Sequence, residues 1–255
     1  DESGRMTKPR RVLVLGALSA MAVATARLYA AEGARLVLAG RDAAALETLA
    51  ADLRARGALS AEAVTADLAT TSPDALLPAL LAPLGGAVDA VYLAYGVLGD
   101  LGLAERDLTV AAQVIDTNYR SAALWCLAAA AVLERQRAGS LVVIGSVAGD
   151  RGRKSNYLYG STKAGLGVLV QGLAHRLAKV GARAVLVKPG FVDTPMTEHI
   201  KGRRGPLWAT PEQVAPTLRK AADGGGTVVY APWFWRPVMA LIRAVPSPIF
   251  HRTNL

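Results

Sequence analysis

The chain has 255 residues, of which 52% are hydrophobic and 19% are charged, and this composition excludes a disordered protein. Its single cysteine excludes an internal disulfide and a multi-cysteine zinc site, and its three histidines lie too far apart for a local metal motif. The net charge of +9 favours an anionic partner such as a phosphorylated cofactor or an anionic lipid, and no nucleic-acid motif supports nucleic acid as the partner.

The two ends of the chain carry separate expectations. Residues 1–11 are polar and basic, unlike a secretory signal. We expect residues 1–10 to be disordered, with Met6 as the native start and residues 1–5 left from expression. No apolar run reaches the roughly twenty residues that a membrane-spanning helix needs. We therefore expect a cytoplasmic protein, with a peripheral position on the inner face of the membrane as an alternative.

Short apolar runs alternate with stretches of helical spacing along most of the chain. The runs predict buried strands at Val12–Leu15, Leu36–Ala39, Ala63–Thr65, Val88–Ala94, Leu141–Ile144, Ala184–Val187 and Val228–Tyr230. Helices are predicted between them, for example at Ala20–Ala31, Ala43–Arg56 and Val110–Arg135. This alternation predicts an α/β domain over residues 11–231, with a parallel sheet covered by helices on both faces.

The predicted first strand runs into a turn of small residues that begins at Gly16. Small side chains there let a pyrophosphate approach the N-terminus of the following helix. We predict that Gly16, Ser19, Ala20 and Met21 bind a dinucleotide. An ordinary tight turn between a strand and a helix is the alternative.

The ends of the second and third strands indicate which dinucleotide is preferred. A site selective for NAD usually has a carboxylate at the end of the second strand. Here Gly40 leaves room and Arg41 can bind a 2′-phosphate, so NADP(H) is favoured, with NAD(H) as an alternative. A surface arginine beside a helix cap at Asp42 is the other interpretation. Asp67, next to Leu68, can accept from the adenine amino group or cap its strand.

The strongest signal is a tyrosine and a lysine at the head of a predicted helix. Tyr159 and Lys163 are spaced i, i+4, so they share one helix face, and Ser146 closes the strand before them. The usual pKa of a phenol is about 10, and a nearby ammonium is expected to lower it. Tyr159 can then protonate a carbonyl oxygen held by Ser146 as a hydride reaches its carbon. Taken singly, each residue has a simpler interpretation. Tyr159 and Lys163 could be a pair on the surface, and Ser146 could be a hydroxyl at the end of a strand.

Together these residues resemble the short-chain dehydrogenase/reductase family, over residues 11–230. The resemblance implies a Rossmann-type, doubly wound sheet. The positions that match the family's catalytic tetrad are Asn118, Ser146, Tyr159 and Lys163. It further implies that Asn118 supports a water that relays protons to Lys163, and that Lys163 binds the nicotinamide ribose.

The same resemblance implies further cofactor contacts. They are Ala94 and Gly96 after the fourth strand, and Pro189, Gly190, Val192 and Thr194 in a proline-glycine turn. Val192 and Thr194 match the positions that contact the carboxamide end of the cofactor.

Three departures from the family pattern stand beside these matches. Alanines at 20 and 22 replace the second and third glycines of the first turn. Ser19 replaces the basic residue of many NADP-dependent members, so the predicted preference depends on Arg41 alone. The usual Asn-Ala-Gly after the fourth strand reads Ala94-Tyr95-Gly96, which brings Tyr95 within reach of the site.

Residues 232–255 form an apolar and basic tail. Trp233, Trp235, Arg236 and Arg243 lie in it, and no acidic residue follows Asp223. Tryptophans beside arginines in a short apolar helix are typical of a membrane interface. Packing on the body or against a second subunit is the alternative. The tail is similar to that of decaprenyl-phosphoryl-2-keto-ribose reductases, which implies a substrate such as a polyprenyl-phosphate keto sugar; ketosphinganine or long-chain ketoacyl reductases are alternatives.

The sequence thus predicts an NADPH-dependent reductase that transfers hydride to a lipid-linked ketone, acts without a metal and forms a homo-oligomer. A soluble reductase of small ketones or sugars, with the tail in oligomer contacts, is one alternative. A non-catalytic NADP-binding sensor is another. The intact tetrad argues against the sensor, because sensing needs no proton donor.

Overall fold

The computed structural model describes residues 8–200 and 205–253. The expectations for Met6 and residues 1–5 lie outside these ranges. Arg10 belongs to the stretch that we expected to be disordered, but it is placed by an ion pair with Asp223.

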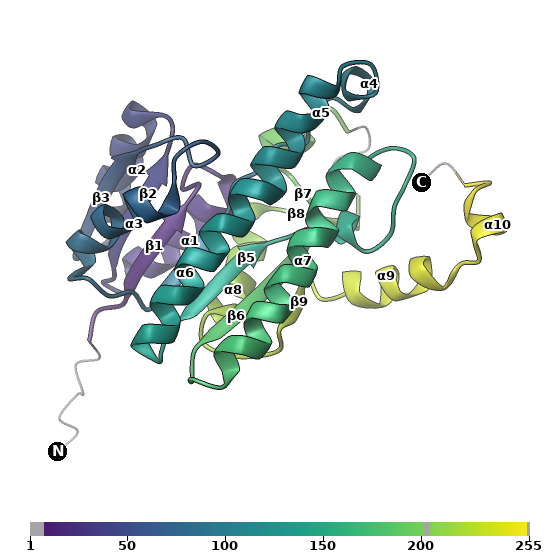
Figure 1. The fold of residues 1–255 in the computed structure, drawn as a ribbon. Helices are drawn as coiled ribbons and strands as arrows, with labels where there is room; N and C mark the ends of the chain where they lie inside the picture. Colours follow the sequence, from purple (N-terminus) through teal and green to yellow (C-terminus); the bar gives the residue numbers. More distant parts are fainter. Residues whose placement is uncertain (1–7, 201–204, 254–255) are drawn as a thin grey trace.

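A seven-stranded parallel sheet forms the centre of the domain, in the order β3-β2-β1-β4-β5-β6-β9 (Figure 1). The strands are β1 Arg11–Leu15, β2 Arg35–Gly40, β3 Ser60–Thr65, β4 Ala90–Leu93, β5 Ser140–Ile144, β6 Arg183–Pro189 and β9 Val228–Ala231. All seven predicted strands are confirmed, with shifts of a few residues at their ends. The strand order reverses between β1 and β4, where doubly wound sheets bind their ligands.

Helices cover both faces of this sheet (Figure 1). One face carries α1 Ala20–Ala31, α2 Ala43–Ala55 and α8 Pro211–Ala221, and the other carries α3 Pro73–Leu81, α6 Ala122–Gln136 and α7 Tyr157–Ala178. Side chains alternate across a strand, so Val12 and Val14 enter one core while Leu13 and Leu15 enter the other. The fold is the doubly wound α/β architecture that the sequence predicts.

The predicted helix Val110–Arg135 proves to be three successive pieces. They are α5 Leu108–Ile115, a π-helical turn at Asp116–Ser121, and α6. A short α4, Leu101–Ala104, precedes them. π-turns inside helices often occur at functional sites, and this one contains Asn118.

A small second sheet lies after β6 and was not predicted. It pairs β7 Phe191–Val192 with β8 Trp208–Ala209 in parallel. Three single turns complete the fold, at Ala82–Leu84, Val147–Gly149 and Pro195–Thr197.

The tail forms α9 Trp235–Ala244 and α10 Ser247–Phe250. Figure 1 shows it in yellow beyond β9, at the opposite side of the domain from β3. Trp235, Met239 and Phe250 are buried, so one side of the tail packs on the body. Among the described residues, no helix has the length and apolar character required to cross a membrane.

Candidate active site

A continuous cavity of about 900 Å³ lies at the carboxyl end of the sheet. It is lined by most of the predicted cofactor residues. These are Gly16, Ser19, Ala20, Met21, Arg41, Asp67, Leu68, Ala94, Gly96, Tyr159, Lys163 and Thr194. Parallel strands end together at this edge, so residues far apart in the sequence share one space.

The turn after β1 depends on a glycine. Gly16 has φ +84°, a left-handed conformation, and a Cβ there would lie 2.6 Å from the Cβ and 2.8 Å from the backbone nitrogen of Tyr95. The Gly16 N–H donates to the carbonyl of Ala39 at 2.9 Å. Ala20 lines the cavity, whereas Ala22 is buried in the core. The backbone thus leaves open space at the N-terminus of α1, which fits a pyrophosphate.

The three charged residues at the adenine end differ in their partners. Asp42 caps α2 by accepting from the Ala45 N–H at 3.0 Å. Asp67 caps its own turn by accepting from the Ala69 N–H at 3.0 Å. Both carboxylates therefore have the capping role of the simpler interpretation, although both also line the cavity. Arg41 is exposed at the cavity and has no ion pair within the described ranges, so its guanidinium remains available to a ligand.

Lys163 is a buried cation. Its side chain follows Tyr159 by one turn of α7, and its Nζ donates to the carbonyl of Ile144 at 3.2 Å. The Nζ lies 5.7 Å from the centroid of the Tyr159 ring. Burial lowers the pKa of Lys163 to about 8. The ammonium is therefore charged at neutral pH, at a cost in desolvation.

The pKa of Tyr159 shifts in the opposite direction to our expectation. Burial raises it to about 12, and a hydrogen bond with Ser146 only partly opposes this. The lowering expected from Lys163 is absent, because desolvation of the buried phenol dominates the shift. Tyr159 is accordingly a protonated phenol at neutral pH, ready to act as a donor.

Ser146 is held next to Tyr159 by two close glycine contacts. Its Oγ accepts from the Ala148 N–H at 3.1 Å and begins the turn Val147–Gly149. A Cβ on Gly160 would lie 2.7 Å from the carbonyl oxygen of Ala148. A Cβ on Gly149 would lie 2.8 Å from the backbone nitrogen of Ala164. Helix α7 therefore packs directly on the turn after Ser146, which sequence reasoning missed.

Asn118 fixes the segment that follows β4. Its Nδ2 donates to the Val97 carbonyl at 2.6 Å, and its Oδ1 accepts from the Val97 N–H at 2.7 Å. A Cβ on Gly96 would lie 3.0 Å from Asn118 Oδ1 and 3.4 Å from Lys163 Nζ. Asn118 and Lys163 thus flank one glycine, in keeping with the implied tetrad. The implied water relay stays a prediction.

Some predicted residues stand away from the cavity. Pro189, Gly190 and Val192 do not line it, although Thr194 from the same turn does. Of the predicted catalytic residues, Asn118 and Ser146 do not line it either, although their neighbours Thr117 and Gly145 do. Val192 is buried in the core beside β8, and Gly190 lies against Trp235. The cofactor contacts implied for Pro189, Gly190 and Val192 stay predictions.

Several lining residues were missed or only anticipated. Tyr95 lines the cavity, as its place in the sequence suggested, and its Oη lies 2.8 Å from Ser121 Oγ. The missed residues are Leu18, Ala43, Ala44, Ala66, Ala69, Val97, Thr117, Ile144, Gly145, Pro195 and Met196. Most are apolar and sit beside a predicted residue, so adjacency was the only signal for them.

Comparisons with known proteins find one matching family and several similar proteins. The family described as "short chain dehydrogenase" matches residues 10–204. An uncharacterised oxidoreductase of Streptomyces coelicolor is 41% identical over 259 residues, which cover 99% of this chain and 98% of that protein. One of Mycobacterium tuberculosis is 38% identical, covering 94% and 96%. A solved structure of a "short chain dehydrogenase/reductase family protein" has a TM-score of 0.75 and 31% identity, covering 88% and 96%.

Proposed function

Because the chain belongs to the short-chain dehydrogenase family and is an NAD(P)-dependent oxidoreductase, we propose that it uses NADPH to reduce a ketone. One observation carries this proposal. A single cavity extends from the Gly16 turn and Arg41 to Tyr159 and Lys163. A dinucleotide bound along it would have its reactive end beside a proton donor.

The bound cofactor would supply the hydride, and the protein's residues would supply the proton and the charge stabilisation. Tyr159 is protonated because burial raises its pKa to about 12. It would donate its proton to the carbonyl oxygen, which Ser146 Oγ would hold. The phenolate left on Tyr159 would be stabilised by the buried ammonium of Lys163, whose charge acts strongly because little water surrounds it.

The preference for NADPH is supported by the free guanidinium of Arg41. Arginine binds phosphate through two parallel hydrogen bonds, a geometry that lysine does not offer. Gly40, directly before it, has no side chain that would crowd a 2′-phosphate. NAD(H) is the weaker ligand on this proposal.

The test of this activity is NADPH oxidation with a panel of cyclohexanone, acetophenone, ethyl acetoacetate and a membrane lipid extract. We expect loss of NADPH with at least one component and none with the Tyr159→Phe variant. A protein that binds NADPH but oxidises it with no component would support the sensor alternative.

We also propose that the substrate is carried by a lipid and that the tail meets an anionic membrane. The outer side of the tail exposes Trp233, Leu241 and Ile249, at 77%, 71% and 59%. The exposed Arg236 and Arg243 lie among them. Apolar side chains can enter the acyl boundary while arginines stay at anionic headgroups. A polyprenyl-phosphate keto sugar fits this surface, and the protein would then lie peripherally on the inner face of the membrane.

Vesicle binding tests this part of the proposal. Each apolar side chain that becomes fully buried in the lipid contributes about 1.5–3 kcal/mol. The double variant W233S/L241S should therefore bind vesicles of phosphatidylglycerol at least about tenfold more weakly than the wild type. The matched control L59S/L108S removes two leucines exposed elsewhere and should bind like the wild type. If the wild type ignores these vesicles at low salt, the soluble-substrate alternative replaces the membrane.

A homo-oligomer is proposed from the surface of two helices. Leu124 and Leu127 on α6 are exposed at 47% and 42%, and Val168 on α7 is exposed at 71%. Helices α6 and α7 pack side by side, so these side chains offer one apolar face to a second copy. Solution mass would test it, with L124S/V168S expected to shift the protein to monomer.

A further inference from the structure

Trp235 is seated directly on the backbone of Gly190. A Cβ on Gly190 would lie 1.8 Å from the indole Nε1 and 2.0 Å from Cε2, so only glycine fits beneath this ring. The ring also stands edge-on to Phe191, with centroids 5.4 Å apart. Trp235 is only 4% exposed. The first residue of α9 is therefore locked onto the turn that leads from β6 towards Thr194 in the cavity wall.

The same part of the tail holds the turn after Ser146. Val147, the next residue, is buried in one apolar cluster with Trp235 and Met239. Arg151, two residues after this turn, donates from Nη1 to the carbonyls of Ile242 and Val245, each at 2.6 Å. The segment from Val147 to Arg151 thus contacts the start of α9 through Val147 and its end through Arg151.

A third link ties this turn to the strands beside the tail. The carboxylate of Asp150 pairs with the ammonium of Lys188 on β6. Its other oxygen accepts from Tyr230 Oη on β9 at 2.7 Å. Asp150 is almost fully enclosed, with a side chain 1% exposed. Because Ser146 directly precedes this turn, the anchors of the following residues help to determine where it lies.

We infer that Trp235 is a positioning residue of the active site, which sets Ser146 against the Gly190–Thr194 segment by packing on Gly190 and on Val147, the residue after Ser146. This inference rests on the proposed reduction of a ketone. It makes the tail part of the catalytic architecture on its inner side, independently of what its outer side contacts. Hydride transfer depends on the relative place of the carbonyl oxygen and the cofactor end, and a displacement of about 1 Å can reduce a rate about 10²-fold.

If Trp235 acts by packing, variants that keep an aromatic ring at this position should retain turnover. The indole Nε1 is buried and has no hydrogen-bond partner within the described residues, so the ring acts by its shape. Trp235→Phe keeps an aromatic ring over Gly190 and should retain turnover to within about threefold of wild type. Trp235→Ala leaves Gly190 and Val147 without their common neighbour, and kcat should fall about 10–100-fold.

A loss of stability alone is excluded by a matched control. Leu133→Ala removes a buried side chain from α6, far from the tail, and should lower the melting temperature without a comparable loss of kcat. We expect kcat for the responding ketone to fall in Trp235→Ala while the dissociation constant for NADPH changes by less than about threefold, because the adenine end of the cavity does not contact the tail. Equal kcat losses in Trp235→Ala and Leu133→Ala would overturn the inference.

A double-mutant cycle tests the contact between Trp235 and Gly190. Gly190→Ala should reduce kcat in the wild type, because the new Cβ would displace the indole. In the Trp235→Ala background the same change should have almost no further effect, since the space above residue 190 is then empty. Additive losses in the double variant would show that the two residues act separately, and would overturn the inference.

A readout without substrate separates this inference from the proposed function. Hydrogen–deuterium exchange at residues 145–151 and 190–194 should increase in Trp235→Ala and stay as in the wild type in Trp235→Phe and Leu133→Ala. A wild type that reduces no ketone, but shows this exchange pattern, would contradict the proposed function and leave the packing link intact. Unchanged exchange in Trp235→Ala would contradict the link.

Discussion

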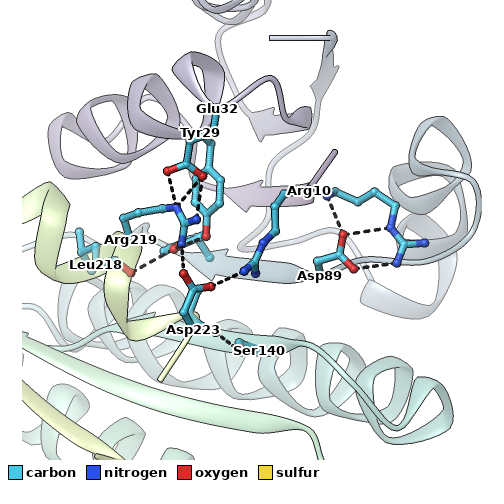
Figure 2. Close-up of polar contacts among 11 residues, drawn as sticks. Arg10, Tyr29, Glu32, Asp89, Ser140, Leu218, Arg219 and Asp223 are labelled. Carbon is cyan, nitrogen blue, oxygen red and sulfur yellow. Dashed lines mark hydrogen bonds and ion pairs between the residues drawn. The ribbon is translucent and has the colours of Figure 1, made fainter. Parts of the chain in front are cut away.

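The amino end of the parallel sheet and the cavity at its carboxyl end differ in how their charged side chains are paired. At the amino end, shown in Figure 2, the charges are paired. Arg219 donates to Glu32 at 2.7 Å and to Asp223 at 2.6 Å, and Arg10 reaches Asp223 at 2.7 Å. Although burial opposes the effect, hydrogen bonds from Arg11 hold the pKa of Asp89 below its usual range.

At the carboxyl end, Asp150 and Lys188 form a pair beside the tail, but the two cations that line the cavity, Lys163 and Arg41, lack such partners. Lys163 is buried, and its ammonium donates to a backbone carbonyl and forms no ion pair with a carboxylate of the described residues. Arg41 is likewise without an ion pair in that part of the chain. A charge with an internal partner stabilises the fold, whereas a charge left without one costs stability and is free for a ligand. The contrast therefore separates residues kept for stability from residues kept for chemistry.

The largest effect that this contrast predicts is on turnover. Tyr159→Phe should lower kcat roughly 10²–10⁴-fold, because the ring remains but its proton donor is lost. The melting temperature and the affinity for NADPH should stay close to those of the wild type. Steady-state kinetics and thermal melts measure both. A variant with near wild-type turnover would remove Tyr159 from its proposed role.

The next effect is a gain in stability at the carboxyl end. Burial lowers the pKa of Lys163 from 10.5 to about 8, so folding disfavours the charged form. Lys163→Met should raise the free energy of unfolding at neutral pH by about 3 kcal/mol while turnover is lost. This difference is complete below pH 8 and should shrink as the pH rises towards 10.5, where the unfolded lysine also becomes neutral. Denaturant melts across this range measure it; a destabilised variant would contradict the argument.

A smaller effect is expected at Arg41, where a partner is supplied only by the ligand. A hydrogen bond to a charged group contributes about 1.5–3 kcal/mol, so Arg41→Ala should weaken NADPH binding by about 10–150-fold. NADH lacks the 2′-phosphate and should bind equally well to both proteins. Fluorescence titration gives the dissociation constants of NADPH and NADH for the wild type and for the variant. The same loss for both cofactors would leave Arg41 only a structural role.

The smallest effect belongs to the amino end. Arg219→Ala breaks both ion pairs and removes a guanidinium that lies 4.4 Å from the centroid of Tyr29. Since Glu32 and Asp223 are partly exposed to solvent, we expect a loss of about 1–2 kcal/mol in the free energy of unfolding. Turnover should be unchanged, which is the reverse of the Lys163 result. If Arg219→Ala lowered kcat without lowering the free energy of unfolding, the proposed difference between the two ends of the sheet would be wrong.

Much of this architecture follows from local pattern. The apolar runs predicted every strand of the large sheet, and the turn at Gly16 and the Tyr159–Lys163 spacing predicted where the cavity lies. These features depend on residues near one another in the chain. The order of strands then follows from the rules of parallel sheets.

What the sequence could not predict depends on contacts between distant segments. The π-helical turn that presents Asn118 is one extra residue in a helix whose apolar period continues on both sides. The raised pKa of Tyr159 arises from burial, which no spacing reveals. The sequence of the tail fits both packing on the body and contact with a membrane interface. The structure gives it a packed side with Trp235 and an exposed side with Trp233, and two neighbouring tryptophans carry no local sign of this division.

The place of Trp235 in the chain also bears on when the enzyme becomes competent during its synthesis. Every strand of the large sheet precedes Trp235, so the sheet and all four tetrad residues can leave the ribosome before the indole does. Chains begin to fold during synthesis from their N-terminal side. On the packing link proposed above, a chain whose tail has not yet docked would reduce a ketone more slowly than the finished protein, and turnover would reach its full rate only when α9 packs on Gly190.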